Sequence, residues 1–287
     1  MFTKKHCSPR KCKIDYSCLS KNILISIAKI LNKNYNAKIK IKKRSKKKLY
    51  NDIKEKLSRS ECKTESCWRN INKIMDKLSD KEKKQFNESF RPLKPDNWNN
   101  NPNTWLNTTD INNVMRQYEK KYPYFKYYGA TPIDFHIKSD DTCLVSNLCN
   151  INLNNLKNKK CIGMVFNTDP HNKSGQHWFS MFIDTVGRNL ENPTIYYFDS
   201  ATAIKDIEEL PLQILNLIDK LQKQSNNKFD ILYNDIKHQY GSTECGVYCI
   251  HFLTEMLKGI AFEDYVSKKL SDKKIEKYRN KFFIENK

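Results

Sequence analysis

The segment from Cys245 to Lys258 predicts a helix that is apolar on almost every side. Its apolar residues lie too close together for an amphipathic surface helix: Val247, Cys249, Ile250, Phe252, Leu253, Met256 and Leu257. Lys258-Gly259 is a typical helix end. Such a helix has to be buried in a core, which places Cys245 at the N-terminus of a buried helix. The unpaired N–H groups and the positive end of the helix dipole there favour a thiolate over a thiol.

Three neighbours of Cys245 bear on a role as nucleophile. Gly246 follows it directly and is expected to leave its side open for a substrate backbone. Gln239 lies six residues upstream, far enough for the chain to fold back, and its amide could donate to a developing oxyanion. His238, next to Gln239, is expected to be a solvated loop residue.

A nucleophilic cysteine needs a base, and among six histidines His177 has the best context. It precedes residues 178–184, a strand-like segment of aromatic and apolar residues. A second such segment, residues 194–198, ends at Asp199. If the two strands are neighbours, Asp199 lies beside His177, where it would fix the tautomer and stabilise the imidazolium. With Gln239 and Cys245, these residues form a complete cysteine-hydrolase set.

Taken singly, each of these residues has a simpler structural interpretation. A cysteine in an apolar helix is usually an inert buried thiol, and Cys249 is expected to fill the core in this way. His177 could be a structural strand residue and Asp199 a turn former. Asp184 competes with Asp199 for the histidine, but alternation along the strand places it on the other face. The occurrence of the whole set, in one order, favours catalysis.

Several short blocks resemble those of known cysteine proteases. His177-Trp178, Phe198-Asp199-Ser200 and Glu244-Cys245-Gly246 resemble the signature blocks of the clan of ubiquitin-like-protein (SUMO) proteases and adenovirus-type processing proteases. A narrower likeness, to the polyprotein-processing proteases of African swine fever virus and related large DNA viruses, extends over nearly the whole chain. It includes the blocks Ser17-Cys18-Leu19-Ser20-Lys21, Thr64-Glu65-Ser66-Cys67 and Tyr278-Arg279-Asn280-Lys281-Phe282-Phe283.

The resemblance implies an α+β fold with a mixed sheet and a central helix that bears the nucleophile. It implies a viral cysteine endopeptidase that cleaves structural polyproteins after Gly-Gly or Gly-X-Gly sites during virion maturation. Such an enzyme would work at the assembly site in the host cytoplasm and in the virion. In the clan, the residue at the position of Trp178 roofs a channel that admits only glycine beside the scissile bond. We therefore expect Trp178 and Gly246 to contact substrate.

The positive charge of the chain lies almost entirely in its first third. Residues 1–90 carry 26 Lys and Arg against 9 Asp and Glu, a net of +17 out of +20. This third also has apolar residues at helical spacing, which predict helices over Lys21–Leu31 and Cys67–Leu78. Two prolines in Arg91–Pro95 suggest a boundary. We expect a basic helical arm over residues 1–92 and a catalytic domain over residues 93–287.

One basic run is denser than the rest of the arm. It comprises Lys42, Lys43, Arg44, Lys46, Lys47 and Lys48. It could bind DNA or another polyanion, and it also matches a nuclear localisation signal, a pattern with many false positives. The simpler interpretation is a solvated charge run in a chain rich in Lys, Asn and Ile.

The ten cysteines, at positions 7, 12, 18, 62, 67, 143, 149, 161, 245 and 249, form no C-x-x-C pair and no zinc-type group with histidine. His6 and Cys7 could in principle gather a metal with Cys12 and Cys18. We nevertheless expect neither a metal nor a cofactor. Residues 1–5 lack the apolar region of a signal peptide, and no stretch approaches the roughly 18 apolar residues of a membrane span. We expect free thiols in a reducing cytosol.

Two other functions fit parts of the sequence. An isopeptidase that removes a ubiquitin-like modifier with a Gly-Gly tail would use the same catalytic residues. A basic nucleic-acid-binding scaffold on a decayed protease fold would use only the arm. The intact set of His177, Asp199, Gln239 and Cys245 disfavours the scaffold, since decay usually removes one of them.

Overall fold

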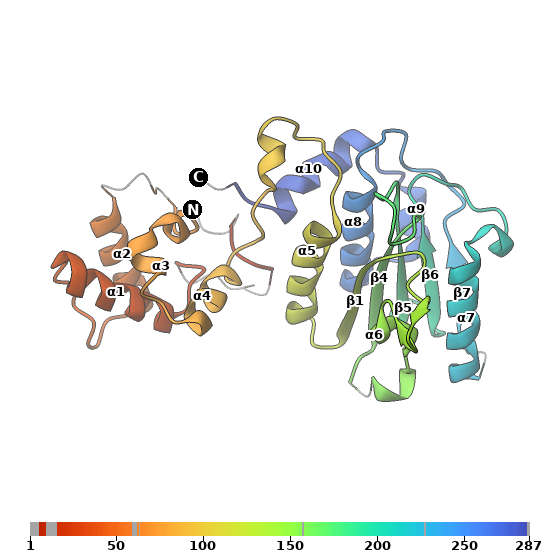
Figure 1. The fold of residues 1–287 in the computed structure, drawn as a ribbon, viewed down its shortest axis with the longest axis horizontal. Coiled ribbons are helices and arrows are strands. Elements are labelled where there is room, and N and C mark those ends of the chain that lie inside the picture. Colours follow the sequence, from red (N-terminus) through yellow and green to blue (C-terminus); the bar gives the residue numbers. More distant parts are fainter. Residues whose placement is uncertain are drawn as a thin grey trace. The chain divides into compact units, whose positions relative to one another are not determined.

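The computed structural model describes residues 6–9, 16–58, 62, 64–156, 158–226 and 228–285 (Figure 1). The chain divides into two compact units, Met1–Lys94 with Lys281–Lys287, and Pro95–Asn280. The division lies two residues beyond the boundary expected from the prolines. The last seven residues group with the N-terminal unit, whereas the sequence placed them in the catalytic domain.

The N-terminal unit is helical. Its elements are α1 (Lys21–Tyr35), α2 (Lys46–Leu57), the 3-10 turn η1 (Cys67–Asn70), α3 (Asn72–Met75) and α4 (Asp80–Asn87). The hydroxyl of Ser20 caps α1, which buries Ile23, Leu24, Ile27 and Leu31 at the expected helical spacing. These residues share one core with α2 and with the large rings of Trp68, Phe86 and Phe90.

The helix expected over Cys67–Leu78 is interrupted. Ile71 leaves helical geometry at φ −87° and ψ 88°, which separates η1 from α3. Trp68 and Ile74 are both buried in the same core. Six residues are not a whole number of helical turns, so one continuous helix would point these two side chains in different directions. The break lets both face the core.

The second unit is built on a five-stranded mixed sheet in the order β1-β4-β5-β6-β7. The strands are β1 (Phe125–Pro132), β4 (Cys161–Asn167), β5 (Trp178–Asp184), β6 (Thr194–Phe198) and β7 (Asp230–Tyr233). The outer pairs β1–β4 and β6–β7 are parallel, and the pairs β4–β5 and β5–β6 are antiparallel. This α+β architecture confirms the expected fold class.

Helices cover both faces of the sheet (Figure 1). Helices α5 (Thr108–Lys121) and α8 (Cys245–Lys258) lie on one face, and α7 (Leu212–Ser225) lies on the other. Alternate residues of β4, β5 and β6 pack against Ile214, Leu217, Ile218 and Leu221 of α7. On the opposite face, Phe198 of β6 stacks on Phe252 of α8 at 4.9 Å between ring centroids.

The remaining elements are short or lie near the C-terminus. They are η2 (Asp96–Asn99), the small hairpin β2 (Lys138–Ser139) and β3 (Thr142–Cys143), α6 (Ser146–Cys149), η3 (Leu153–Asn155), η4 (Ile207–Glu209), α9 (Phe262–Ser267) and α10 (Asp272–Phe282). Within the described residues, no helix combines the length and apolar character that a bilayer crossing requires.

Six of the cysteines are paired as disulfides. The pairs are Cys7–Cys18, Cys62–Cys67 and Cys143–Cys149, with Cα atoms 5.2, 5.2 and 6.3 Å apart. The expectation of free thiols is therefore wrong for these six. The partners are close in sequence, but whether their Cα atoms come near enough to pair depends on the fold around them, which the residue spacing does not reveal. Cys161, Cys245 and Cys249 are free, and Cys12 lies outside the described residues.

Candidate active site

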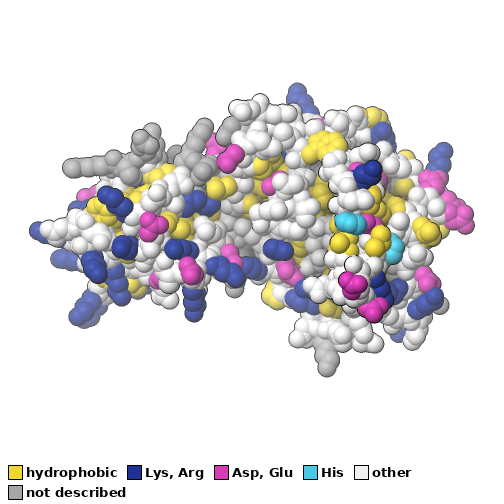
Figure 2. All heavy atoms as spheres, viewed as in Figure 1, with side chains coloured by type: hydrophobic (Ala, Val, Ile, Leu, Met, Phe, Trp, Pro, Cys, Tyr) yellow, Lys and Arg dark blue, Asp and Glu magenta, His cyan; other side chains and the backbone are white. Residues whose placement is uncertain are grey.

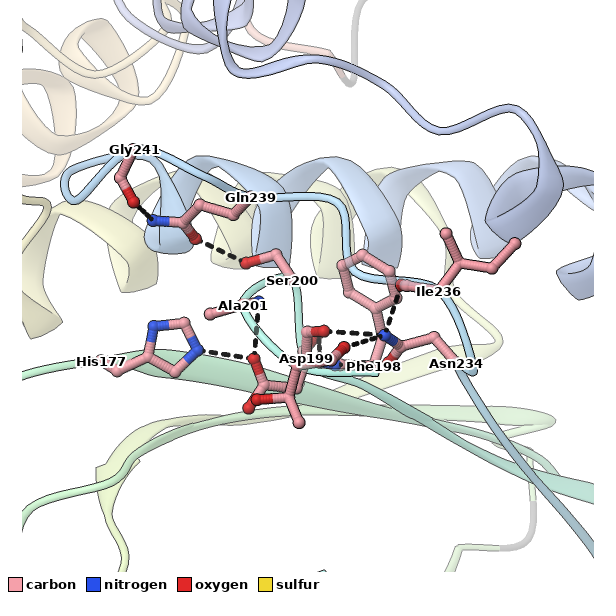
Figure 3. Close-up of polar contacts among 11 residues, drawn as sticks. His177, Phe198, Asp199, Ser200, Ala201, Asn234, Ile236, Gln239 and Gly241 are labelled. Atoms are coloured by element: carbon pink, nitrogen blue, oxygen red, sulfur yellow. Dashed lines mark hydrogen bonds and ion pairs between the residues drawn. The ribbon is translucent and has the colours of Figure 1, made fainter. Parts of the chain in front are cut away.

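His177 and Asp199 meet at one edge of the sheet. Strands β5 and β6 are antiparallel neighbours with Ser180 opposite Phe198, so the start of β5 lies beside the end of β6. His177 immediately precedes β5 and Asp199 immediately follows β6. The Nε2 atom of His177 lies 2.7 Å from Oδ1 of Asp199 (Figure 3). The structure thus brings together the two residues that the strand pattern paired.

Hydrogen bonds with Asn234 and Ala201 hold Asp199 in place. Its backbone N–H donates to the side-chain oxygen of Asn234 at 2.8 Å, and the Asn234 amide donates back to the Asp199 carbonyl at 2.8 Å. The Ala201 N–H donates to Oδ1 of Asp199 at 2.9 Å. Asn234 directly follows β7 and is fully buried. Sequence reasoning missed Asn234, because an asparagine after a strand is an ordinary turn signal.

Cys245 is the first residue of α8, and 1% of its surface is exposed. Burial disfavours the charged ring of His177, but hydrogen bonds and charges from Asp199 and Cys245 outweigh this effect. Together they raise the pKa of His177 to about 10. Cys245 is thus the second partner of the His177 side chain. His177 therefore bridges the carboxylate and the cysteine, and its ring is positively charged at neutral pH.

Gln239 is buried beside this group, with its side chain fixed at both ends (Figure 3). The Ser200 hydroxyl donates to Oε1 of Gln239 at 2.7 Å, and Nε2 donates to the Gly241 carbonyl at 3.0 Å. The backbone N–H of Gln239 also donates to the Ser200 carbonyl. An amide nitrogen carries two N–H groups. One of them has no partner in the described part of the chain and can donate to a ligand.

The residues next to the histidine and the cysteine both contact Leu106. The Trp178 indole N–H donates to the Leu106 carbonyl at 2.9 Å, and Trp178 is 6% exposed. A Cβ at Gly246 would lie 2.9 Å from Cβ of Leu106. The expectation that Gly246 leaves an open side for substrate is therefore wrong, because Leu106 fills that space. Glycine is needed here so that the helix can approach Leu106. No pattern in the sequence indicated that Leu106 would lie at the site.

The rival residues have structural roles. Asp184 lies at the far end of β5 from His177 and accepts from the backbone N–H groups of Val186 and Asn189. Cys249 is buried core, as expected, and burial raises the pKa of its thiol well above the usual range. The expectation for His238 was wrong. It is 1% exposed, and burial, aided by the charge of Lys269, lowers its pKa to about 4.

The basic run of the arm lies at the start of α2. Figure 2 shows Lys and Arg side chains, in dark blue, spread over the helices of the N-terminal unit. Arg44 pairs with Asp52 at 3.3 Å, and Lys46 donates to the Ser17 carbonyl at 2.9 Å. The other four residues are exposed: Lys42, Lys43, Lys47 and Lys48. The first turn of α2 has no acidic residue, so its lysines oppose the helix dipole. Helix stability does not account for their position.

A cysteine at the head of a buried helix, beside a carboxylate-bound histidine and a buried glutamine, defines the arrangement of a thiol hydrolase. Residues 117–287 match the model of the Ulp1 protease family, C-terminal catalytic domain. The chain therefore belongs to the Ulp1 protease family and carries its cysteine peptidase domain.

Individual relatives agree with this assignment. The Putative thiol protease of Acanthamoeba polyphaga mimivirus is 36% identical over 185 residues, which cover 62% of this chain and 56% of that protein. The SUMO-1 cysteine protease of African swine fever virus is 25% identical over 197 residues, which cover 63% of this chain and 68% of that one. The chain thus matches little more than half the length of the mimivirus relative. A crystal structure of the African swine fever virus protease has the same fold, with a TM-score of 0.67, 18% identity, and coverage of 99% and 98% of the two chains.

The charge of Asp199 is predicted to control the titration of His177. Asp199→Asn keeps an acceptor for the ring but removes the negative charge, so the pKa of His177 should fall from about 10 toward its ordinary value of about 6.5. Ring nitrogen shifts of histidine-labelled protein, recorded by NMR from pH 5 to 10, measure this directly. His238 serves as the internal control and should remain neutral in both proteins. An unchanged His177 titration would contradict the role of Asp199.

Proposed function

We propose that this protein is a cysteine endopeptidase that cleaves viral structural polyproteins after Gly-Gly or Gly-X-Gly sites. Its triad would be Cys245, His177 and Asp199, with Gln239 in the oxyanion hole. The observation that carries the proposal is the 2.7 Å contact between His177 and Asp199 directly beside Cys245. A decayed fold serving only as a scaffold would have no need of this arrangement.

The catalytic cycle follows from the atoms in the site. The charged ring of His177 already holds the proton of Cys245, and the sulfur attacks the scissile carbonyl carbon. The carbonyl π electrons move to oxygen, and the oxyanion accepts from the free N–H of Gln239 and the backbone N–H of Cys245. His177 then protonates the departing amine as the C–N bond breaks, which leaves a thioester. Water, deprotonated by His177, attacks the thioester carbonyl, and the C–S bond breaks to release the new carboxyl group. The proton stays on His177, which restores the charged ring.

Preference for glycine would come from a rigid wall near Cys245. Trp178 is buried and tied through its indole N–H to Leu106, and Leu106 presses against Gly246. Side chains fixed in this way cannot move aside for a bulky residue at the scissile bond. The same wall would suit the Gly-Gly tail of a ubiquitin-like modifier. Because one relative is named a SUMO-1 cysteine protease, deconjugation is the second candidate function.

The cellular setting belongs to the same proposal. A polyprotein protease of this kind would act at the assembly site in the host cytoplasm and would enter the virion. The four exposed lysines of the basic run would help to retain it near packaged DNA.

Substitutions at the site are predicted to separate the catalytic roles. Cys245→Ala should abolish cleavage, and Asp199→Asn should leave partial activity. Gln239→Ala should lower kcat by on the order of 100- to 1,000-fold. Gln239→Glu, which keeps an acceptor for Ser200 but loses the amide N–H groups, should be equally impaired. Steady-state cleavage of a Gly-Gly peptide measures each effect.

The buried Cys249 gives a matched control for these variants. Cys249→Ala removes a thiol one turn further along the same helix and should retain activity. Full activity in the Cys245→Ala protein would refute the proposed mechanism as a whole.

Two substrates distinguish the proposed function from its rival. One is a peptide panel with internal Gly-Gly-X and Gly-X-Gly sites, and the other is a full-length SUMO precursor. We expect the peptides to be cut in a Cys245-dependent manner while the precursor stays intact. Cleavage of the precursor alone would identify a deconjugating enzyme. Matched peptides with Ala in place of the last Gly control for general proteolysis and should resist cleavage.

The basic run is predicted to bind duplex DNA through charge. Replacing both Lys47 and Lys48 with Gln should weaken binding and should reduce the slope of log affinity against log salt by about 2. Fluorescence anisotropy with labelled DNA over a salt series measures both quantities. The control replaces Lys54 and Lys56, two exposed lysines near the end of the same helix, with Gln. Equal effects of the two pairs, or no binding by the wild type, would contradict a specific role for the run.

A further inference from the structure

The chain between Gln239 and Cys245 has no helix or strand of its own. We call residues 239–244 the oxyanion loop, because under the proposed function they connect the two groups that would hold the oxyanion. The Gln239 amide and the Cys245 N–H can work together only if this loop is held still. Tyr240 in the loop is 67% exposed, so burial alone does not fix it.

Asp272, the first residue of α10, holds the first half of the loop. Its Oδ2 accepts from the backbone N–H groups of Tyr240 and Gly241 at 2.9 and 2.8 Å. Its Oδ1 accepts from the Tyr248 hydroxyl of α8 at 3.0 Å. One carboxylate thus joins two consecutive loop amides to the helix that carries Cys245. Charge-assisted bonds of this kind are stronger than neutral ones.

Arg279, about two turns further along α10, holds the second half of the loop. Its Nη2 donates to the Thr243 carbonyl at 2.9 Å, and its Nη1 donates to the Thr104 carbonyl at 2.7 Å. Only 3% of Arg279 is exposed. Its charge is balanced by Glu276, and its guanidinium carbon lies 4.8 Å from the centroid of the Trp98 ring. The fork of the guanidinium therefore joins two segments that are distant in sequence.

The two segments joined by Arg279 flank the head of α8. Thr243 lies two residues before Cys245. Thr104 lies two residues before Leu106, which accepts from the Trp178 indole and fills the space beside Gly246. The ring of Tyr278, next to Arg279, lies edge-on to His251 of α8 at 4.2 Å. Helix α10 is thus anchored on α8 and reaches both sides of Cys245.

We infer that α10 positions the oxyanion loop, with Asp272 and Arg279 as positioning residues for the proposed peptidase. Neither residue touches the reacting atoms. Each binds backbone groups of the loop and also a group outside it, the Tyr248 hydroxyl for Asp272 and the Thr104 carbonyl for Arg279. Their loss should displace the loop, while the apolar packing of α8 keeps that helix buried. The expected effect on catalysis rests on the proposed function, whereas the expected displacement of the loop does not.

The variants follow from the hydrogen-bond geometry. Arg279→Gln removes the fork, and Arg279→Lys keeps the charge but cannot reach two carbonyls in one plane. Asp272→Ala is the independent second variant, because it removes the carboxylate that accepts from both loop N–H groups. Lys277→Gln is the matched control, since it removes one positive charge from an exposed position of the same helix.

The first experiment combines peptide cleavage with alkylation of Cys245 by iodoacetamide, each over a pH series. Alkylation depends on the Cys245–His177 pair and has no oxyanion. We expect Arg279→Gln, Arg279→Lys and Asp272→Ala to lower kcat by about 10- to 100-fold. KM and the alkylation rate should stay within about twofold of wild type, as should every parameter of Lys277→Gln. Unchanged kcat, or a parallel fall in alkylation, would overturn the inference.

The second experiment does not need proteolysis. Hydrogen–deuterium exchange of the full-length chain reports on peptides that cover residues 239–245. Asp272→Ala should accelerate exchange there, because the Tyr240 and Gly241 amides lose their acceptor, and peptides from β5 and β6 should not change. Unchanged exchange in the loop would overturn the inference. An inactive wild type would count against the proposed function only, and the exchange result would still decide the role of α10.

Discussion

Helix α8 is buried on nearly every side, and its burial determines where the site can form. Twelve of its residues are buried, from Cys245 to Leu257. Each fully buried large apolar side chain contributes roughly 1.5–3 kcal/mol to the stability of the fold. Displacing the helix would lose many of these contributions together. Phe252 stacks on Phe198 of β6, one residue before Asp199. The packing that buries the helix therefore also fixes the distance from Cys245 to the sheet edge where His177 and Asp199 meet.

Within this rigid frame, acceptors rather than burial decide the charge of each histidine. His177 and His238 are both removed from water, which disfavours the protonated ring in each case. His177 has Asp199 and Cys245 as partners, and its pKa rises to about 10. His238 packs among the rings of Phe198, Tyr248 and Tyr265, near the positive charge of Lys269, and its pKa falls to about 4. Two histidines, one in contact with Phe198 and the other with Asp199, therefore carry different charges.

The sequence alone was enough to predict the residues that point into the site, but not the residues that hold them in position. His177, Asp199 and Cys245 lie at the ends of strongly patterned elements. There, the alternation of strand residues and the polarity of the helix indicate which side chains lie close together. Asn234, Leu106 and Arg279 act through backbone groups at separations of 35, 72 and 175 residues. No local pattern encodes such contacts. The prediction that Gly246 leaves an open side was wrong for the same reason, since its neighbour Leu106 comes from a distant loop. The disulfides and the break at Ile71 likewise depend on tertiary packing.

The C-terminal residues complicate any separation of the basic arm from the peptidase. Helix α10 begins at Asp272, beside the oxyanion loop, and the chain from Lys281 onward groups with the N-terminal unit. There Ile284 donates to the Pro92 carbonyl and accepts from the Lys94 N–H, and Phe283 and Ile284 are buried. Removing residues 1–92 would strip Ile284 of the core that it shares with α1 and α2. Lost cleavage after truncation would thus not show that the arm binds substrate or DNA. Substitutions of exposed lysines remove charge without this effect, so they can assign a role to the arm.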